Sequence, residues 1–473
     1  MQPIITPEES ARLDAAAADR IEELMERAGL WVALAAVEMG AGYGWRVAVL
    51  AGPGNNGGDA YAAAKYLQRR GALVTVHALA FPKGEDSAAR KAGSAAVHAG
   101  VTVVALGGPA SKCDLIIDGL FGAGFHGELP AAVLPWLDSP APLLAIDVPS
   151  GLSAADGTTT GPSFRASRTV TFHALKVGHL LGEGPELCGP IDVRDIGLEG
   201  GNPEMLLAEE DDAPRPSRLR TDHKWSSGSV LVVGGSPGLT GAAVLAGRSA
   251  LEGGAGAVAI AVPGRWQPVV EGLVAGVMSK PIGTGERFDA SDVDEVLAYA
   301  ARFDVLALGP GLGAEQDKFV AELLSHWDGP MVIDADGLNA IRHPAQLENR
   351  AGPTIITPHA GEFTRLAGVE AGYEAAAALA RATGIVVLLK GNPTFVSDAN
   401  ETWVVASGGP ELATIGTGDV LTGMVAALWA QGLAPGTAAR SGAYWHGVAG
   451  RRLSNRRRVT AEQLVSEVGR FVK

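Results

Sequence analysis

The chain has 473 residues, of which 64 are glycine and 47% are hydrophobic, and its formal net charge is −14. This length can bury full cores in two or three domains, and glycine without a three-residue period excludes a collagen-like fibre. The acidic balance excludes a general surface for nucleic-acid phosphates, although backbone N–H groups can still bind anions locally.

The sequence predicts a cytoplasmic protein without a membrane span. Its first residues lack the basic and apolar regions of a signal peptide. Apolar stretches such as Ala242–Val262 are interrupted by Arg248, Glu252 and glycines, so none reaches the ~18 residues that a span requires. Cys113 and Cys188 match no zinc spacing, and we expect them to be reduced thiols.

The first part of the chain alternates helices with short apolar runs. One helix is expected over Pro7–Met39, and two more over Ala60–Arg70 and Ser87–Ala99. Runs rich in β-branched residues and separated by helices predict a parallel, doubly wound α/β sheet. The runs that predict its strands are Arg46–Ala51, Leu73–Leu79, Val101–Leu106, Leu115–Ile117, Leu143–Ile146 and Thr169–Phe172.

The acidic and proline-containing stretch Glu209–Ser217 predicts a linker, which we place at residues 208–220. A second α/β series follows, with helices expected over Ala242–Glu252 and Val420–Ala430. Because its motifs differ from those of the first series, we expect two different folds rather than a duplication. Its predicted strands are Ser229–Val233, Ala257–Val262, Val305–Leu308, Met331–Ile333, Thr354–Ile356, Ile385–Leu389 and Thr394–Ser397.

A glycine-rich motif follows the apolar run that ends at Ala51. A strand-to-helix turn of this kind exposes backbone N–H groups and the positive end of a helix to an anion. Paired amides and a carboxylate exceed what an ordinary turn requires, so we interpret the motif as a ligand-binding loop, distinct from the dinucleotide and P-loop patterns. Its residues are Asn55, Asn56, Gly57, Gly58 and Asp59.

Two aspartates, Asp118 and Asp147, follow apolar runs of the same predicted sheet. The carboxyl ends of parallel strands are where such sheets bind ligands. One aspartate at such a position is typical of a turn cap, whereas two with flanking glycines favour a functional site. Lys176 is a candidate ion-pair partner for one of them.

Nearly all of residues 1–205 resemble the NAD(P)H-hydrate epimerases, on the segments NNGGD, DGLFGAG, DVPSG and TFHALKVG, and we assign residues 1–207 to this domain. The resemblance implies a Rossmann-like fold and the interconversion of the R and S forms of a nicotinamide nucleotide hydrated at C6 of its ring. Asp147 and Lys176 would be the catalytic residues. The hydrate would lie on Asn55, Asn56, Gly57, Gly58 and Asp59 and on Gly122, Ala123, Gly124, Phe125, His126, Gly127 and Glu128.

The same resemblance implies a potassium site made of Asn56, Asp118 and Ser150, whose oxygen atoms suit a hard cation. Epimerisation needs proton transfer at or beside C6, which one positioned carboxylate near neutral pH can perform. Proteins of this fold also occur as non-catalytic modules, and the sequence leaves this alternative open.

The strongest motif of the second part is Gly416-Thr417-Gly418-Asp419, which opens an apolar helix. Its backbone N–H groups form an anion-binding turn, and an aspartate there can accept a hydroxyl proton during phosphoryl transfer. The alternative is an ordinary first-turn acid favoured by the helix dipole. The motif resembles the ribokinase-like superfamily, whose members phosphorylate small alcohols.

The ordered loops after the other strands make residues 221–473 similar to the ADP-dependent NAD(P)H-hydrate dehydratases. The resemblance implies that phosphate passes from ADP, with Mg²⁺, to the hydroxyl of the S hydrate, and that its loss restores NAD(P)H and leaves AMP. Asp419 would be the base. The hydrate would be bound by Ala242, Gly311, His359 and Asp419, and the nucleotide by Lys390, Gly391, Asn392, Pro393, Thr394, Gly416, Thr417 and Gly418.

Two segments depart from the usual pattern of that family. Asn392 and Pro393 stand where small residues are usual, and Gly409–Leu412 replaces the usual Gly-Asn-Pro-Gly-Met, which bears on phosphate contacts rather than on the class. We predict a bifunctional nicotinamide nucleotide repair enzyme that forms a homo-oligomer, with no nucleic-acid or membrane partner. The alternative is a small-alcohol kinase with a non-catalytic N-terminal module. The sequence leaves open ADP against ATP, and NADH hydrate against NADPH hydrate.

Overall fold

The computed structural model describes residues 1–84, 86–217, 227–348 and 350–471. Contacts among them divide the chain into two compact units. The N-terminal unit comprises Gln2–Glu204, and the C-terminal unit comprises Met1 and the chain from Met205 onward. The sequence placed this boundary at residue 207, and the last positions of its proposed linker, 218–220, lie outside the described residues.

The N-terminal unit is built on a parallel sheet with the strand order β4-β3-β2-β5-β6-β7-β9. The order reverses between β2 and β5, as in doubly wound folds, and the predicted fold is confirmed here. Outside this sheet, β1 (Gln2–Ile5) pairs with β8 (Leu175–Lys176) in parallel. The sheet strands are β2 (Arg46–Ala51), β3 (Leu73–Ala78), β4 (Thr102–Ala105), β5 (Leu115–Gly119), β6 (Leu143–Ile146), β7 (Arg168–Phe172) and β9 (Ile191–Arg194).

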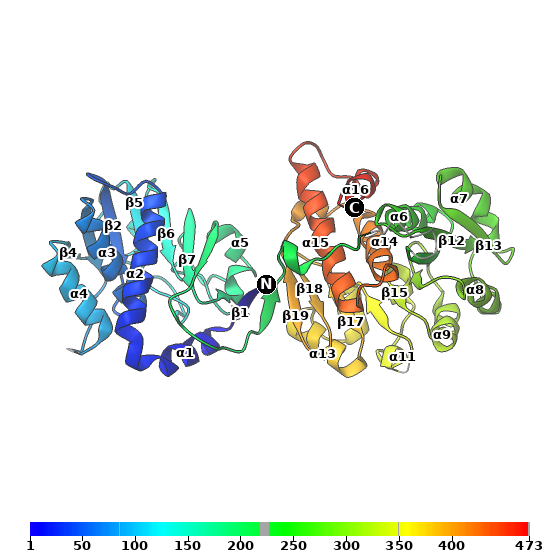
Figure 1. The fold of residues 1–473 in the computed structure, drawn as a ribbon, viewed down its shortest axis with the longest axis horizontal. Coiled ribbons are helices and arrows are strands. Elements are labelled where there is room, and N and C mark those ends of the chain that lie inside the picture. The colour runs from blue at the N-terminus through cyan, green and yellow to red at the C-terminus, as the bar shows by residue number, and fades with distance from the viewer. Residues whose placement is uncertain (85, 218–226, 349, 472–473) are drawn as a thin grey trace. The chain divides into compact units, whose positions relative to one another are not determined.

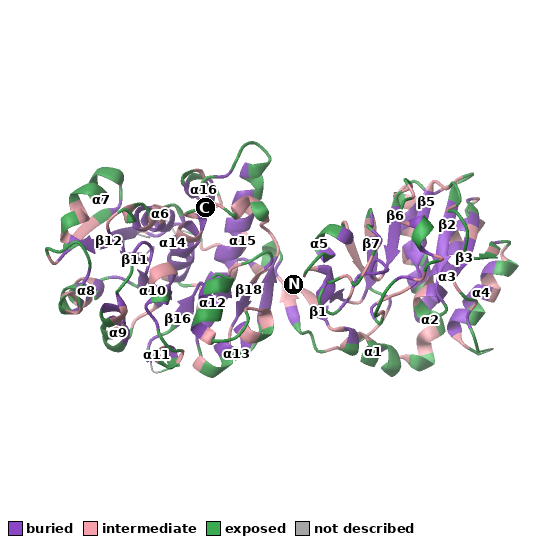
Figure 2. Cartoon of the chain, turned by 180° about the vertical axis from the view of Figure 1, so that it is seen from behind, coloured by how far each residue is buried: buried purple, intermediate pink, exposed green. Residues whose placement is uncertain are grey.

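Both faces of this sheet are covered (Figures 1 and 2). In β2, Val47 and Val49 pack beneath helices on one face, and Ala48 and Leu50 pack against Trp136 and its neighbours on the other. The predicted helix over Pro7–Met39 is two helices, α1 and α2, separated by a 3₁₀ turn. The helices are α1 (Pro7–Ala16), α2 (Ile21–Glu38), α3 (Asn55–Arg69), α4 (Ala88–His98) and α5 (Gly184–Leu187).

The C-terminal unit has a sheet with the order β13-β12-β11-β14-β15-β16-β17-β18-β19-β10. In this order, all strands from β13 at the edge to β17 run parallel to one another. Strand β18 pairs antiparallel with both β17 and β19. The strands are β10 (Met205–Leu207), β11 (Ser229–Val233), β12 (Ala257–Pro263), β13 (Met278–Ile282), β14 (Val305–Leu308), β15 (Met331–Ile333), β16 (Thr354–Ile356), β17 (Val386–Leu389), β18 (Thr394–Ser397) and β19 (Thr402–Val405).

One large core joins this sheet to α6, α14, α15 and α16, and α14 is buried along most of its length. Figure 1 shows α8, α9, α11 and α13 on the other side of the strands. The helices are α6 (Thr240–Glu252), α7 (Gln267–Leu273), α8 (Val293–Ala300), α9 (Asp317–His326), α10 (Ala335–Asn339), α11 (Ala345–Glu348), α12 (Ala360–Ala367), α13 (Tyr373–Thr383), α14 (Thr417–Ala430), α15 (Pro435–Ser454) and α16 (Ala461–Val468).

Residues 208–217, which the sequence placed in a linker, belong to the C-terminal unit. Ala208 and Ala213 belong to its core, and the Ala213 carbonyl accepts a hydrogen bond from Trp445 at 2.8 Å.

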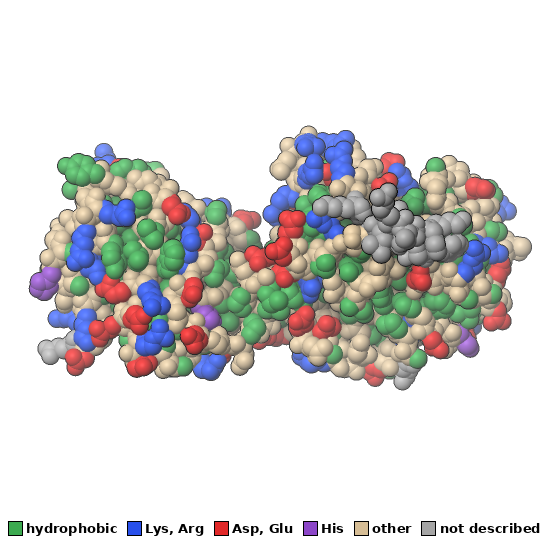
Figure 3. All heavy atoms as spheres, viewed as in Figure 1, with side chains coloured by type: hydrophobic (Ala, Val, Ile, Leu, Met, Phe, Trp, Pro, Cys, Tyr) green, Lys and Arg blue, Asp and Glu red, His purple; other side chains and the backbone are tan. Residues whose placement is uncertain are grey.

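On the visible face of each unit, basic and acidic side chains are interspersed (Figure 3). Within the described residues, no helix is long and apolar enough to cross a membrane, and Cys113 and Cys188 are free thiols.

Candidate active sites

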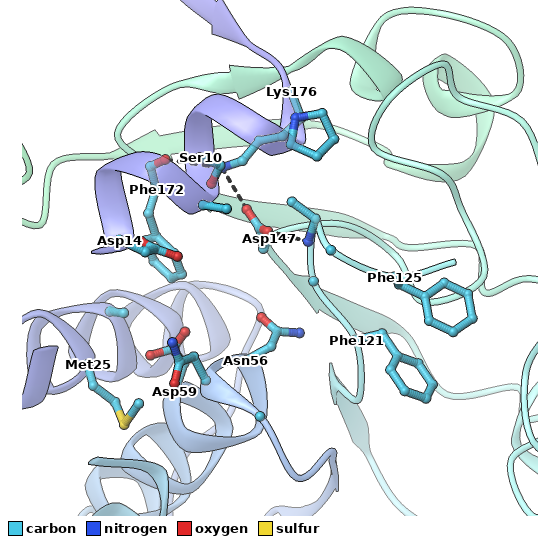
Figure 4. Close-up of a pocket in the computed structure, with 18 of the residues that line it drawn as sticks. Ser10, Asp14, Met25, Asn56, Asp59, Phe121, Phe125, Asp147, Phe172 and Lys176 are labelled. Atoms are coloured by element: carbon cyan, nitrogen blue, oxygen red, sulfur yellow. Dashed lines mark hydrogen bonds and ion pairs between the residues drawn. The ribbon is translucent and has the colours of Figure 1, made fainter. Parts of the chain in front are cut away.

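A cavity of about 640 Å³ opens in the N-terminal unit at the carboxyl ends of β2, β5 and β6. This is where the strand order reverses, which is the usual ligand site of such sheets. The loops that follow the three strands line one side, and α1 and α2 line the other (Figure 4). The predicted loop residues Asn55, Asn56 and Asp59 and the predicted aspartate Asp147 line this cavity together.

Close backbone packing explains the glycines at the start of α3. A Cβ on Gly57 would lie 1.9 Å from the Gly52 carbonyl oxygen, and a Cβ on Gly52 would lie 1.9 Å from the Leu120 carbonyl oxygen. The end of β2, the loop after β5 and the first turn of α3 therefore touch directly. The first-turn N–H groups, which no preceding helical turn can satisfy, begin at Asn55 on the cavity wall.

Asp147 is held rigidly at the base of the cavity. Its φ of 66° is uncommon for a residue other than glycine. Oδ1 lies 2.7 Å from the Nζ of buried Lys176 and accepts a 2.9 Å hydrogen bond from Thr171, while Oδ2 accepts one from Ala123 N–H at 2.9 Å. Burial alone would raise the pKa of Asp147, but the Lys176 ammonium and these donors outweigh burial and lower it.

His179 fixes the backbone at this point. Its Nδ1 accepts a hydrogen bond from Lys176 N–H at 3.0 Å, so its Nε2 donates to the Asp147 carbonyl oxygen at 2.8 Å. Burial and the neighbouring ammonium lower the pKa of His179 to about 4, so the ring is neutral near pH 7. Nothing in the sequence singled out His179 or Thr171, because their roles depend on strand neighbours.

Asp118 and Ser150 form a buried oxygen-rich corner. Asp118 lies within β5, not after it as predicted, because the strand extends to Gly119. It accepts hydrogen bonds from Ser150 N–H and Ser150 Oγ, each at 2.7 Å, and burial raises its pKa to about 6 despite these donors. The side-chain nitrogen of Asn56 is buried without a hydrogen-bond partner among the described residues.

The cavity lining includes part of each predicted binding segment and residues that the sequence did not indicate. Asn55, Asn56, Asp59 and residues 122–126 line it. Gly57 and Gly58 lie within α3 but outside the lining, where they face the Gly52 backbone and the Met25 side chain. Gly127 and Glu128 also lie outside the lining, and Gly127 O accepts a hydrogen bond from Thr160. The lining residues that the sequence did not indicate include Ser10, Asp14, Met25 and Phe172, which come from α1, α2 and β7 (Figure 4).

In the C-terminal unit, the Gly416–Asp419 motif forms the first turn of α14. Gly416 is the N-cap and has a φ of 89°, a left-handed conformation that glycine adopts without strain. The N–H groups of the following turn have no preceding carbonyl in the helix to bond, so they can bind an anion. A Cβ on Gly416 would lie 2.8 Å from the Leu245 side chain, which places α6 beside this turn.

A buried ion pair lies below the turn. Lys390 Nζ is 2.7 Å from Asp334 Oδ1 and 3.8 Å from Glu362 Oε2. Thr422 of α14 donates a 2.6 Å hydrogen bond to Asp334 Oδ2, which ties the helix to the strand end. Burial would lower the pKa of Lys390, but these carboxylates outweigh it and raise the pKa.

Asp419 has an environment that suits a base. Burial, and then the negative charge of Asp334, raise its pKa to about 7, although Lys390 acts in the opposite direction. A base with a pKa near the working pH combines a sizeable ionised fraction with proton affinity. The sequence indicated Asp419 and Lys390, but it did not indicate that Asp334 couples them.

The other predicted residues of this unit lie around the same edge of the sheet. A Cβ on Gly311 would lie 3.1 Å from the Cβ of Ala242, so these two are neighbours. His359 caps α12 by accepting hydrogen bonds from Gly361 and Glu362 N–H, and it pairs with Lys390 through a β-bridge. Residues 390–393 connect β17 to β18, and Thr394 is the first residue of β18. Among these residues, all of which the structure describes, the Lys390 side chain pairs with the buried carboxylates.

Comparison with known families agrees with this division. The family described as YjeF-related protein N-terminus matches residues 21–178, and the family described as NAD(P)H-hydrate dehydratase matches residues 230–469. A ribokinase-like superfamily protein of Enterococcus faecalis superimposes with a TM-score of 0.51 and 21% identity, covering 57% of this chain and 95% of that chain. The two folds and sites thus define a two-domain α/β enzyme, Rossmann-like and ribokinase-like.

Two relatives match most of the chain. A Moorella thermoacetica protein named bifunctional NAD(P)H-hydrate repair enzyme Nnr is 38% identical over 469 residues, covering 92% of this chain and 88% of that protein. A Salinibacter ruber protein of the same name is 36% identical over 449 residues, covering 86% and 83%. The chain belongs to the family of bifunctional NAD(P)H-hydrate repair enzymes. This confirms the predicted family and enzyme class, and it does not favour a small-alcohol kinase.

Proposed function

We propose that the N-terminal cavity interconverts the R and S forms of NAD(P)H hydrate and that Asp147 is a proton-transfer residue of this reaction. The ion pair with Lys176 supports the proposal, because it holds Asp147 as a carboxylate within a cavity of nucleotide-binding type. The anionic part of the nucleotide would lie against the first turn of α3, at Asn55–Asp59. Residues 122–126 would face the nicotinamide ring.

In the C-terminal unit, the S hydrate would be dehydrated with ADP as phosphate donor. Asp419 accepts the proton of the C6 hydroxyl, and the oxygen attacks the terminal phosphorus, so AMP departs. Loss of phosphate from C6 with a proton from the neighbouring carbon then forms the double bond of NAD(P)H. The Gly416–Gly418 turn would stabilise the transferred phosphoryl group. The conversion is chemically reasonable because phosphate is a better leaving group than hydroxide.

The ligands of the C-terminal reaction would lie around the same sheet edge. Ala242, Gly311 and His359 would bind the hydrate, and Lys390–Thr394 would approach the nucleotide. Mg²⁺ would neutralise phosphate charge when bound. Because Asp334 and Glu362 already accept hydrogen bonds from Thr422 and His359 N–H, the ion would be held mainly by the nucleotide phosphates.

Potassium would be bound by Asn56, Asp118 and Ser150. The buried Asn56 nitrogen without a partner fits this role, because turning the amide would place an oxygen there instead. Asp118 supplies a buried carboxylate whose ionisation a cation would favour. A bound monovalent cation would supply electrostatic stabilisation and fix the loops after β5 and β6.

The test is recovery of NADH from a mixture of R and S NADH hydrate with ADP and Mg²⁺, followed by absorbance. The wild-type chain should restore both epimers rapidly. Asp147→Asn should restore the S fraction at the normal rate and the remainder only as fast as it epimerises spontaneously, whereas Asp419→Asn should restore neither. Absence of NADH with either ADP or ATP in the wild-type chain would refute the proposed function.

A further inference from the structure

Three carboxylates face the epimerase cavity from three different elements: Asp14 from α1, Asp59 from α3 and Asp147 from the turn after β6 (Figure 4). The other titratable side chains in the described lining are Lys176 and His126. Isolated carboxylates are costly in a partly desolvated cavity unless they are paired or protonated. Whether each carboxyl group is ionised or protonated therefore depends on its partners.

Asp147 forms an ion pair with Lys176, which carries the only ammonium group among the described residues that line the cavity. Lys176 Nζ lies 2.7 Å from Asp147 Oδ1 and also donates to Thr171 Oγ1 at 2.9 Å. The Phe172 and Ala174 carbonyl oxygens accept its remaining hydrogen bonds at 3.2 and 3.3 Å. The ammonium is thus fully engaged on the Asp147 side, and Asp147 is the carboxylate of the cavity that stays ionised.

Asp59 has no such compensation. Among the described residues, its carboxyl group has no hydrogen-bond donor and no ion-pair partner. Burial raises the pKa of Asp59 well above its usual range, and the negative charges of Asp147 and Asp14 add to the rise. Burial and Asp147 also raise the pKa of Asp14, against the effect of Lys176. Burial and the neighbouring carboxylates therefore favour the protonated form of Asp59.

We propose that Asp59 is the proton donor of the epimerase reaction, that Asp147 is its base, and that Asp14 is a positioning residue that retains the proton on Asp59. Two carboxyl groups kept in opposite states by their surroundings are the usual signature of an acid and base pair. The inference rests on the proposed epimerase function. It extends the site to α1, which precedes the family-matched range 21–178.

The pair can invert C6 by exchange of water. Asp59 gives its proton to the C6 hydroxyl as the C–O bond breaks, and the oxygen leaves with the bonding electrons as water. The ring nitrogen lone pair forms a C6=N1 iminium bond. A water molecule from solvent then adds to the opposite face, its electron pair forms the new C–O bond, and Asp147 accepts its proton. Proton return from Asp147 to Asp59 through solvent restores the site.

The experiment uses the full chain without ADP, so that the dehydratase is idle, and follows the conversion of purified R hydrate to S hydrate by chromatography. Asp59→Asn should lower kcat roughly 10²- to 10⁴-fold, as expected for loss of a general acid. Glu8→Gln is the matched control, since it removes one negative charge from α1 at an exposed position outside the cavity and should leave the rate unchanged. Thermal unfolding of each variant checks that the unit folds.

The positioning role of Asp14 is tested by the pH profile of kcat/KM. An acid must be protonated to act, so activity falls as pH rises through its pKa. Asp14→Asn removes a negative charge beside Asp59, so this fall should move to lower pH by about one unit. The acidic limb set by Asp147 should move in the same direction, because the Asp14 and Asp147 carboxylates also repel each other. A uniform loss of rate with an unchanged profile would assign Asp14 a structural role and overturn that part of the proposal.

Isotope exchange tests the chemical step. In ¹⁸O-labelled water, each inversion should place one ¹⁸O atom on C6, read by mass spectrometry with the spontaneous exchange subtracted. Inversion without label would overturn the water-exchange step, and full activity of Asp59→Asn would overturn its role as acid. Both results are distinct from failure of the proposed function, in which the wild-type chain itself would not convert the R hydrate.

Discussion

Asp147 combines an unusual backbone with a buried ion pair. Its positive φ is fixed by hydrogen bonds from its N–H to the Val170 carbonyl at 2.7 Å and from His179 to its own carbonyl. Aspartate and asparagine tolerate this conformation better than most residues. Local strain of this kind is retained where function requires an orientation, which agrees with the position of Asp147 at the base of the cavity.

The ion pair between Asp147 and Lys176 should contribute to the stability of the N-terminal unit. Asp147→Asn should keep the backbone conformation but leave Lys176 buried without its counter-charge, which should lower the free energy of unfolding of the N-terminal unit by roughly 3–5 kcal/mol. Adding Lys176→Met should recover part of the loss, because the unpaired ammonium is then absent. Urea denaturation of the single and double variants measures both effects. If the losses in free energy of unfolding from the two substitutions simply add, the Asp147 and Lys176 side chains are not energetically coupled.

The dehydratase should lose activity in acid. Because burial and Asp334 raise the pKa of Asp419 to about 7, the base becomes protonated as pH falls through that value. The rate of NADH formation from S hydrate at saturating ADP should therefore fall about tenfold for each pH unit well below 7. A rate independent of pH between about 5 and 8 would exclude Asp419 as the base.

The Asp419 carboxyl group should also lower the free energy of unfolding as the pH rises. Its folded pKa of about 7 exceeds the ordinary value of 3.8, so the folded chain holds a proton that the unfolded chain releases, and stability is lost as pH rises between these values. Asp419→Asn should therefore be more stable than wild type at pH 8, by up to about 4 kcal/mol at roughly 1.4 kcal/mol per pKa unit. Exposed Asp294→Asn on α8 should show no such gain.

At the scale of elements, the join between β2 and α3 shapes the epimerase site. Gly57→Ala would force a Cβ against the Gly52 carbonyl oxygen and should lower stability by roughly 1–3 kcal/mol, with loss of epimerase activity. Gly54→Ala is the matched comparison, because nothing lies within 4 Å of its Cβ and its φ is −95°. Its unfolding midpoint should stay near that of wild type. Equal destabilisation of the two variants would contradict the packing argument.

Strands and motif positions could be predicted from the sequence because apolar runs and glycine turns are local signals. The predicted edges of β11, β14, β15, β16 and β18 agree with the structure. Asp118 was placed after its strand because the run Leu115–Ile117 stops at a polar residue, whereas pairing with β2 carries β5 on to Gly119. Hydrogen bonding between strands decided that boundary, and no local pattern contains it.

The cavity wall made by α1 could not be predicted. Asp14 and Ser10 lie on a helix with no motif, and they reach the cavity only through the packing of α1 in the folded unit. The role of Asp334 was hidden for the same reason, since Lys390 and Thr422 bond to it from segments 56 and 88 residues away. Such contacts between distant segments have no local pattern in the sequence.

For the whole molecule, each unit has its own hydrophobic core, so we expect two unfolding transitions in calorimetry. ADP with Mg²⁺ should raise only the transition of the C-terminal unit, by about 2.7 kcal/mol of added stability at a ligand concentration one hundred times Kd. Asp147→Asn should lower only the other. A single transition that moves as a whole with ADP would show that the two units unfold together.

The position of helix α1 also matters when such chains are truncated or compared with relatives. A fragment beginning at Ile21 would keep the whole range matched by the N-terminal family, yet it would lack one wall of the cavity. A fragment that keeps this wall must therefore start before that range. Relatives that match residues 21–178 equally well can still differ in the part of the cavity wall that α1 provides.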